Sequence, residues 1–139
     1  SKPQPAMANN ILGIDYGAKR VGVALAVEGS SPQRLVTLLG GTELIPALQQ
    51  LIHEHDITTV VVGLPRNLDG NDTAQTVEVR QFTAALAAAC PDLKIVLQDE
   101  AATSQTARER LQGRSEADIK AILDQEAAVI IVEDYARAG

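Results

Sequence analysis

The run ITTVVVG, from residue 57 to residue 63, limits the possible folds more than any other stretch of the sequence. β-Branched residues follow one another there without polar alternation, and the run ends at a glycine. This pattern is typical of a strand buried on both faces, in a parallel or mixed sheet that helices cover. Hydrophobic residues make up 45% of the chain and aromatic residues only 2%, so the core of such a sheet would be aliphatic. We therefore expect an α/β domain.

The sequence predicts five strands and four helices. Apolar runs predict strands over 10–15, 21–27, 35–39, 57–63 and 93–98. Apolar residues at helical spacing predict helices over 44–55, capped by Thr42, and over 73–90, 103–111 and 124–137. This order predicts a five-stranded mixed sheet, made of a three-stranded antiparallel meander and two parallel strands, with helices on both faces.

The chain reads as one domain. Residues 10–139 suffice for a single core of ordinary size, and residues 1–9 read as a disordered tail or an expression remnant. We find no apolar run long enough to span a membrane and no basic-then-apolar leader, so we expect neither a membrane segment nor a signal peptide. The single cysteine, Cys90, cannot pair within the chain, which favours the cytoplasm.

The charge balance argues against a broad nucleic-acid-binding surface, because the formal net charge is −6. The cations are clustered, however. Lys19 and Arg20 follow the first strand, Arg66 lies in the loop LPRNLDGND, and Arg108 lies in the third helix. Each also has an ordinary interpretation, as a residue of a hairpin tip, a turn or a solvated helix face. The clusters weaken the objection without removing it.

Acidic residues fall at the ends of two predicted strands and near the start of the last helix. Asp15 ends the first strand, whereas Asp99 and Glu100 end the last one. Alternation lets only one of that pair face Asp15 and leaves open which one. Asp124 shares a helical face with apolar residues, so it should point at the sheet. Taken singly, these residues also suit a turn, a helix cap and a helix dipole.

Carboxylates that converge at one rim would repel one another and raise each other's pKa. A divalent cation relieves this conflict, and Mg²⁺ and Mn²⁺ prefer oxygen ligands. Two such ions about 4 Å apart can activate a water and stabilise the leaving oxygen of a phosphodiester. We therefore expect a site for Mg²⁺ or Mn²⁺, with two ions, in which Gly17 lets the backbone come close and Lys19 or Arg20 meets a substrate phosphate.

Five segments resemble, in order, the bacterial YqgF-like family, over about residues 11 to 135: DYGAKRVGVALA, VVVGLPRNLDG, TVEVRQF, DEAATSQTA and LDQEAAVIIVEDY. The family is described as Holliday junction resolvases and as nucleases that mature the 5′ end of pre-16S rRNA. Its fold is ribonuclease H-like, similar to the RuvC resolvase. The resemblance implies that Asp15, Glu100 and Asp124 are the catalytic, metal-binding acids, and it chooses Glu100 over Asp99.

The chain departs from the family pattern at two places. The family usually has an arginine after the DE pair, where this chain has Ala101. If that arginine grips a phosphate, Arg108 is a candidate to replace it. After Asp124 the family tends towards small residues, whereas this chain has Gln125 and Glu126. Glu126 lies about 200° round the helix from Asp124, so we interpret it as a surface residue, with an extra metal-facing acid as the alternative.

The site would bind nucleic acid, either RNA or branched or single-stranded DNA, through the substrate-binding candidates Lys19, Arg20, Arg66, Asn67 and Arg108. The leading hypothesis is a metal-dependent nuclease that acts through in-line attack by an activated water. Two other classes stay open: half of a sugar kinase or actin-like ATPase, and a non-catalytic binding module in nucleic-acid metabolism or ribosome biogenesis. We expect no membrane partner, and a homodimer would suit a symmetric four-way junction.

Overall fold

The structure is a computed structural model that describes residues 9–66 and 69–138, and residues 1–8 of the expected tail lie outside this range. Five strands and four helices follow one another along the chain. They are β1 (Asn10–Tyr16), β2 (Arg20–Ala26), β3 (Gln33–Leu39), α1 (Leu44–Glu54), β4 (Ile57–Pro65), α2 (Ala74–Ala89), β5 (Lys94–Glu100), α3 (Thr103–Arg110) and α4 (Glu116–Ala138). No helix in the described ranges is long and apolar enough to cross a membrane.

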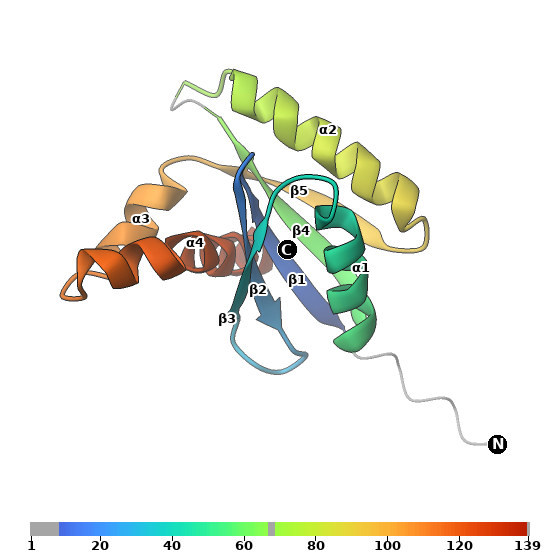
Figure 1. Cartoon of the computed structure of the whole chain (residues 1–139), viewed down its shortest axis with the longest axis horizontal. Coiled ribbons are helices and arrows are strands. Elements are labelled where there is room, and N and C mark those ends of the chain that lie inside the picture. The colour runs from blue at the N-terminus through green and yellow to red at the C-terminus, as the bar shows by residue number, and fades with distance from the viewer. Residues whose placement is uncertain (1–8, 67–68, 139) are drawn as a thin grey trace.

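The strands form one sheet in the order β3-β2-β1-β4-β5. β1 pairs antiparallel with β2, and β2 pairs antiparallel with β3, whereas β1–β4 and β4–β5 are parallel pairs. The predicted meander with two added parallel strands is therefore confirmed. Helices α1 and α2 cover one face of the sheet, α4 covers the other, and α3 packs against α4 (Figure 1).

The face under α1 and α2 carries the main aliphatic core. Its fully buried side chains alternate along the central strands and meet those of the two helices, and they include Leu12, Ile14, Val60, Val62, Leu48 and Leu86. The rings of Tyr16 and Phe82 stack with their centroids 4.5 Å apart, which joins the end of β1 to α2.

The face under α4 is lined with small residues, which allow the helix to approach the sheet closely. A Cβ on Gly22 would overlap the backbone carbonyl of Asp124, and a Cβ on Gly63 would overlap the side chain of Ile131. Glycine is therefore required at these positions by the space that α4 occupies. The close approach fixes where the side chains of α4 stand over the strand ends.

The last helix corrects one prediction. Helix α4 begins at Glu116, eight residues before the predicted start at Asp124. The segment from Glu116 to Leu123 is helical because the Ser115 hydroxyl accepts a hydrogen bond from the Asp118 backbone amide (3.1 Å) and Ile119 is buried. Asp124 thus lies in the third turn, too far from the N-terminus to serve the helix dipole.

Two smaller predictions about helices are also wrong. The residue before α1 is Glu43, and no side chain caps that helix, so Thr42 is not its cap. Apolar spacing in the predicted helix over 73–90 also places Val77 on its inward face, but 49% of this residue is exposed. Thr76 and Val79 are buried instead, because the Thr73–Thr76 capping box sets the rotation of the first turn.

Candidate active site

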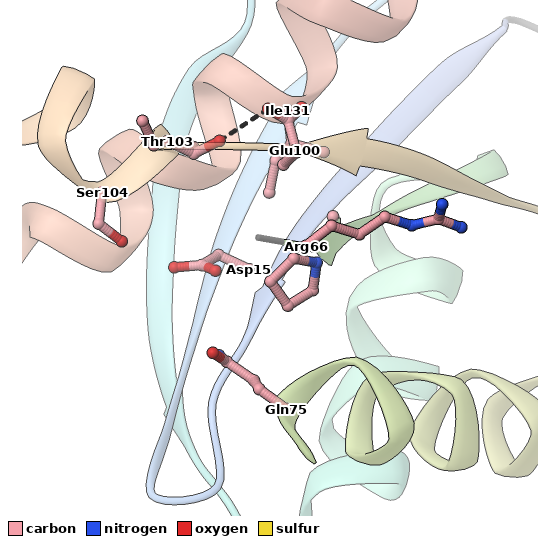
Figure 2. Close-up of a pocket in the computed structure, with 10 residues that line it drawn as sticks. Asp15, Arg66, Gln75, Glu100, Thr103, Ser104 and Ile131 are labelled. Atoms are coloured by element: carbon pink, nitrogen blue, oxygen red, sulfur yellow. Dashed lines mark hydrogen bonds between the residues drawn. The ribbon is translucent and has the colours of Figure 1, made fainter. Parts of the chain in front are cut away.

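A cavity of about 160 Å³ opens at the rim where β1, β4 and β5 end. Asp15, Gly63 and Glu100 come from these strands and line it, and Gln75, Thr103 and Ser104 add polar side chains from the first turns of α2 and α3. Figure 2 shows the Asp15 carboxylate in the middle of this group, with Gln75 and Ser104 pointing towards it. The cavity is thus a carboxylate site walled by two helix N-termini.

Sheet register places glycines on both sides of Asp15. Asp15 lies opposite Gly22 of β2, while Ile14 pairs with Val62, so Gly63 lies beside Asp15 on β4. Gly63 has no side chain to separate β1 from β5, and so the space between Asp15 and Glu100 stays open. A Cβ on Gly63 would also stand 3.5 Å from Cγ of Glu100.

The structure resolves the choice that alternation left open on β5. Glu100 pairs with Pro65 and turns into the cavity, whereas Asp99 pairs with Leu64 and faces the other way. The side chain of Asp99 is 67% exposed, and its Oδ1 lies 3.4 Å from Nε of Arg66. Glu100 is therefore the acid of the pair that shares a cavity with Asp15.

Asp124 reaches the same rim from α4 without lining the cavity. Its backbone and Cβ lie over Gly22, the register partner of Asp15. Its Oδ2 accepts a hydrogen bond of 3.0 Å from Nε of Arg20, which forms an ion pair at the mouth of the site. The carboxylate of Asp124 is thus close to Asp15 and neutralised by an arginine.

Both cavity carboxyl groups favour the protonated form. Burial raises the pKa of Asp15 to about 7, and the charge of Asp124 adds to the rise. Burial also raises the pKa of Glu100 to about 8. The Thr103 hydroxyl, which donates to Oε2 of Glu100 (2.7 Å), opposes this rise, whereas neighbouring Asp134 on α4 adds to it.

These carboxylates fit a divalent cation in chemistry, although the third acid is not in place. Oε1 of Glu100 is buried and receives no hydrogen bond from a donor among the described residues, and neighbouring Asp134 raises the pKa of Glu100 as a second carboxyl group. Two desolvated carboxyl groups with one unpartnered oxygen form the donor set that Mg²⁺ or Mn²⁺ takes. In residues 9–66 and 69–138, however, no three Asp, Glu, His or Cys side chains stand close enough together to hold an ion.

The predicted phosphate-binding cations are mostly engaged elsewhere. Arg20 pairs with Asp124, Arg66 lies near Asp72 and Asp99, and Arg108 donates to Glu116 at 2.9 Å. Figure 2 shows the Arg66 guanidinium pointing away from Asp15. Lys19 lies at the exposed tip between β1 and β2, and the predicted Asn67 lies outside the described residues.

The structure shows the environment of the two departures from the family pattern, at Ala101 and Glu126. Ala101 is exposed in the link between β5 and α3, and Ala102 after it adopts a left-handed conformation with φ of 59°. Glu126 is not a surface residue: its side chain is 14% exposed and accepts from Arg110 at 3.3 Å. It ties α4 to α3, so the expectation of a surface position is wrong.

Sequence reasoning missed Gln75 and Ser104 as cavity residues and Asp134 as the neighbour of Glu100. Polar residues in a first helical turn are common for capping alone, so the sequence carried no signal for the first two. Asp134 lies ten residues after Asp124 on the same helix. Helical side chains meet at a spacing of three or four residues, so this spacing did not group Asp134 with the site.

Comparisons with known proteins agree with this architecture. Residues 9–138 match the family model described as RuvX, Holliday junction resolvase. A protein of Acetivibrio thermocellus named "Putative pre-16S rRNA nuclease" is 30% identical over 90% of this chain and 93% of its own. A protein of the same name from Shewanella oneidensis is 35% identical over 92% and 94%. Thermus thermophilus RuvC in complex with a Holliday junction substrate is 17% identical, with a TM-score of 0.57 over 94% of this chain and 96% of that one, which shows the ribonuclease H-like fold.

Proposed function

Since the chain belongs to the RuvX Holliday junction resolvase family, we propose that its rim cavity hydrolyses phosphodiester bonds in nucleic acid with divalent metal ions. One observation carries the metal-dependent part of the proposal. Asp15 and Glu100 are both desolvated in one cavity, and a buried oxygen of Glu100 has no partner among the described residues. In the deprotonated form, such an arrangement is costly unless a cation is bound there.

Asp15 and Glu100 would hold the ions, which are Mg²⁺ or Mn²⁺ and two in number, and Asp124 would complete the ligand set. Bound there, the ions would supply an activated water and charge neutralisation at the leaving oxygen. Asp124 would bind an ion only after its ion pair with Arg20 breaks. Without an ion, this pair holds the Asp124 carboxylate close to Asp15. Because ligands must be deprotonated, Asp15 and Glu100 each release a proton on binding.

The substrate that we propose is pre-16S rRNA, which the names of the relatives give, with a Holliday junction as the second candidate. The family resemblance implies the 5′ end as the part that is cut. Lys19 is exposed at the tip beside Arg20, and we propose that it binds a phosphate that flanks the cut. A four-way junction has two equivalent strands to cut, so activity on it would require a homodimer. The single cysteine supports a reducing compartment, and we place the protein in the cytoplasm.

The test is cleavage of labelled precursor rRNA and of a synthetic four-way junction with Mg²⁺ or Mn²⁺. We expect Asp15→Asn to lower kcat/KM about a thousandfold, because a ligand that supports several kcal/mol of transition-state stabilisation is lost. Asp99→Asn is the matched control, since Asp99 lies beside Glu100 at the end of β5 but outside the cavity. Its kcat/KM should stay within about threefold of the wild type. Full activity of Asp15→Asn would overturn the site.

A non-catalytic nucleic-acid-binding module with the same fold is the second candidate. The absence of a three-acid cluster among the described residues and the pairing of three predicted substrate arginines favour it. Calorimetric titration with Mn²⁺ distinguishes the two. The nuclease should bind Mn²⁺ and lose this affinity in Asp15→Asn, whereas a binding module would retain RNA affinity without metal or turnover.

A further inference from the structure

We infer that Gln75 and Ser104 form a phosphate-binding subsite, in which they hydrogen-bond to the non-bridging oxygens of the phosphodiester opposite the carboxylates. The inference rests on the proposed function and identifies substrate-contacting residues beyond the acids. Both side chains line the cavity, and both point towards Asp15 (Figure 2). They come from different helices, so one phosphate between them would touch two walls of the site.

The positions of the arginines are the first reason for this inference. A phosphate in the cavity needs hydrogen-bond donors, and cations are the usual source. Arg66 lines the cavity, but its guanidinium points away from Asp15 and lies near Asp72 and Asp99. Arg20 does not line the cavity and is bonded to Asp124. Gln75 and Ser104 are the neutral donors of the cavity wall that point towards Asp15.

The hydrogen bonds of the neighbouring side chains are the second reason. Thr76 donates to the Pro65 carbonyl (2.5 Å) and belongs to the capping box with Thr73, and Thr103 donates to Glu100. Each of these hydroxyl groups already serves the fold. Gln75 and Ser104 make no side-chain hydrogen bond within the described residues, so their polar groups are available to a ligand.

The backbone supports the same conclusion. Gln75 is the second residue of α2, and Ser104 is the second residue of α3. Amide N–H groups in a first turn lack intrahelical acceptors, and the helix dipole favours an anion there. Because the carboxylates and their cations would lie on the other side, a phosphodiester fits between a cationic wall and a wall of hydrogen-bond donors.

The experiment compares Gln75→Ala and Ser104→Ala with Gln81→Ala and Gln105→Ala, which change exposed side chains of the same helices outside the cavity. We expect kcat/KM on a labelled oligonucleotide with Mn²⁺ to fall roughly tenfold for each cavity variant, as for a lost hydrogen bond to a charged group. The control variants should stay within about twofold. Ser104→Thr, which keeps the hydroxyl, should recover the activity lost in Ser104→Ala.

Two binding measurements separate this inference from the nuclease function. Mn²⁺ affinity should be the same in Gln75→Ala as in the wild type, because the carboxylates are untouched. In an Asp15→Asn background, fluorescence anisotropy should show that both cavity variants bind the labelled oligonucleotide more weakly than both controls.

If the wild type cleaves and the cavity variants match the controls, the subsite is overturned while the nuclease function stands. If the wild type cleaves no substrate, the function is overturned, and the anisotropy comparison alone decides the subsite: equal affinities overturn it, and weaker binding by the cavity variants supports it.

Discussion

The two faces of the sheet are built for different tasks. Under α1 and α2, large aliphatic side chains such as Leu12 and Leu86 interdigitate in a fully buried core. Under α4, Gly22 and Gly63 bring the helix against the strands, and Asp15 stands between them. The same strands supply both faces, since alternate residues point in opposite directions.

This difference shows that the two faces of the sheet have separate roles: one provides stability and the other positions the carboxylates. Burial of large apolar groups stabilises the first face, whereas the second gives up side-chain volume to place carboxylates in a desolvated cavity. A carboxylate such as Asp15, whose pKa burial raises to about 7, opposes folding in its charged form. If the roles are separate, a substitution on one face should leave the property that depends on the other face unchanged.

The largest expected effect comes from matched changes on the two faces. Gly22→Ala places a methyl group into the Asp124 carbonyl, and it should lower the free energy of unfolding by at least about 3 kcal/mol. Leu86→Ala empties part of the opposite core and should cost about 2–5 kcal/mol. Urea denaturation measures both. Under conditions where both variants stay folded, kcat/KM should fall in Gly22→Ala, since Asp124 moves, and should hold in Leu86→Ala.

Equal losses of activity in the two variants would break this comparison, because they would mean that the aliphatic face also sets the geometry of the site.

The pH dependence of stability should come from the α4 face alone. Because burial raises the pKa of Asp15 to about 7 and that of Glu100 to about 8, the native state binds more protons than the unfolded chain between about pH 4 and pH 8. The free energy of unfolding without metal should therefore fall as pH rises through this window. The share of Asp15 is on the order of 4 kcal/mol, from about 1.4 kcal/mol per pKa unit over the rise from 3.8 to about 7.

Urea midpoints at pH 5 and pH 8.5 test this prediction. Asp15→Asn should flatten the profile, Asp99→Asn should not, and Mg²⁺ should restore stability at the higher pH because it binds the deprotonated carboxylates. A wild-type profile that is flat over the whole window would show that the cavity does not desolvate its acids.

The smallest effect concerns the link between α3 and α4. Arg110 lies 2.8 Å from Glu133 and 3.3 Å from Glu126, and these acids raise its pKa against the opposing effect of burial. Arg110→Met should cost about 1–2 kcal/mol, because it leaves two partly buried carboxylates with fewer partners. It should also lower turnover slightly, since α3 carries the cavity residues Thr103 and Ser104.

Arg108→Met is the control on the same helix. Arg108 and Glu116 are 50% and 65% exposed, so their ion pair should contribute less than about 0.5 kcal/mol. If both variants were equally stable, α3 would be held by packing alone.

The sequence was sufficient to predict the sheet because its signals are local. The β-branched run from Ile57 and the alternation around Asp15 each specify a strand, and the order of elements then leaves few topologies. The start of α4 was placed too late because the segment from Gln112 to Asp118 is polar, although Ser115 caps the helix and Ile119 is buried. Local polarity concealed a helix that tertiary packing stabilises.

The site was predictable only in part. Asp15 and Glu100 share a cavity, but alternation alone could not choose Glu100 over Asp99, because the choice depends on the register between β4 and β5. The partners of Arg20 and Arg66 could not be predicted either. A long cationic side chain pairs with whichever carboxylate the tertiary structure brings within reach, and sequence distance does not encode that. Glu126 was misplaced for the same reason.

The close seating of α4 on glycines also has a consequence for assembly during synthesis. Helices α1 and α2 precede α4 in the chain, so a chain that emerges from its N-terminus can cover the aliphatic face first. The opposite face carries glycine, alanine or an acidic residue at many positions. Before α4 docks, it therefore exposes little apolar surface to which other nascent proteins could bind. The rim that carries Asp15 is then completed last, when α4 docks, so a partly synthesised chain can cover its aliphatic face before the candidate site is complete.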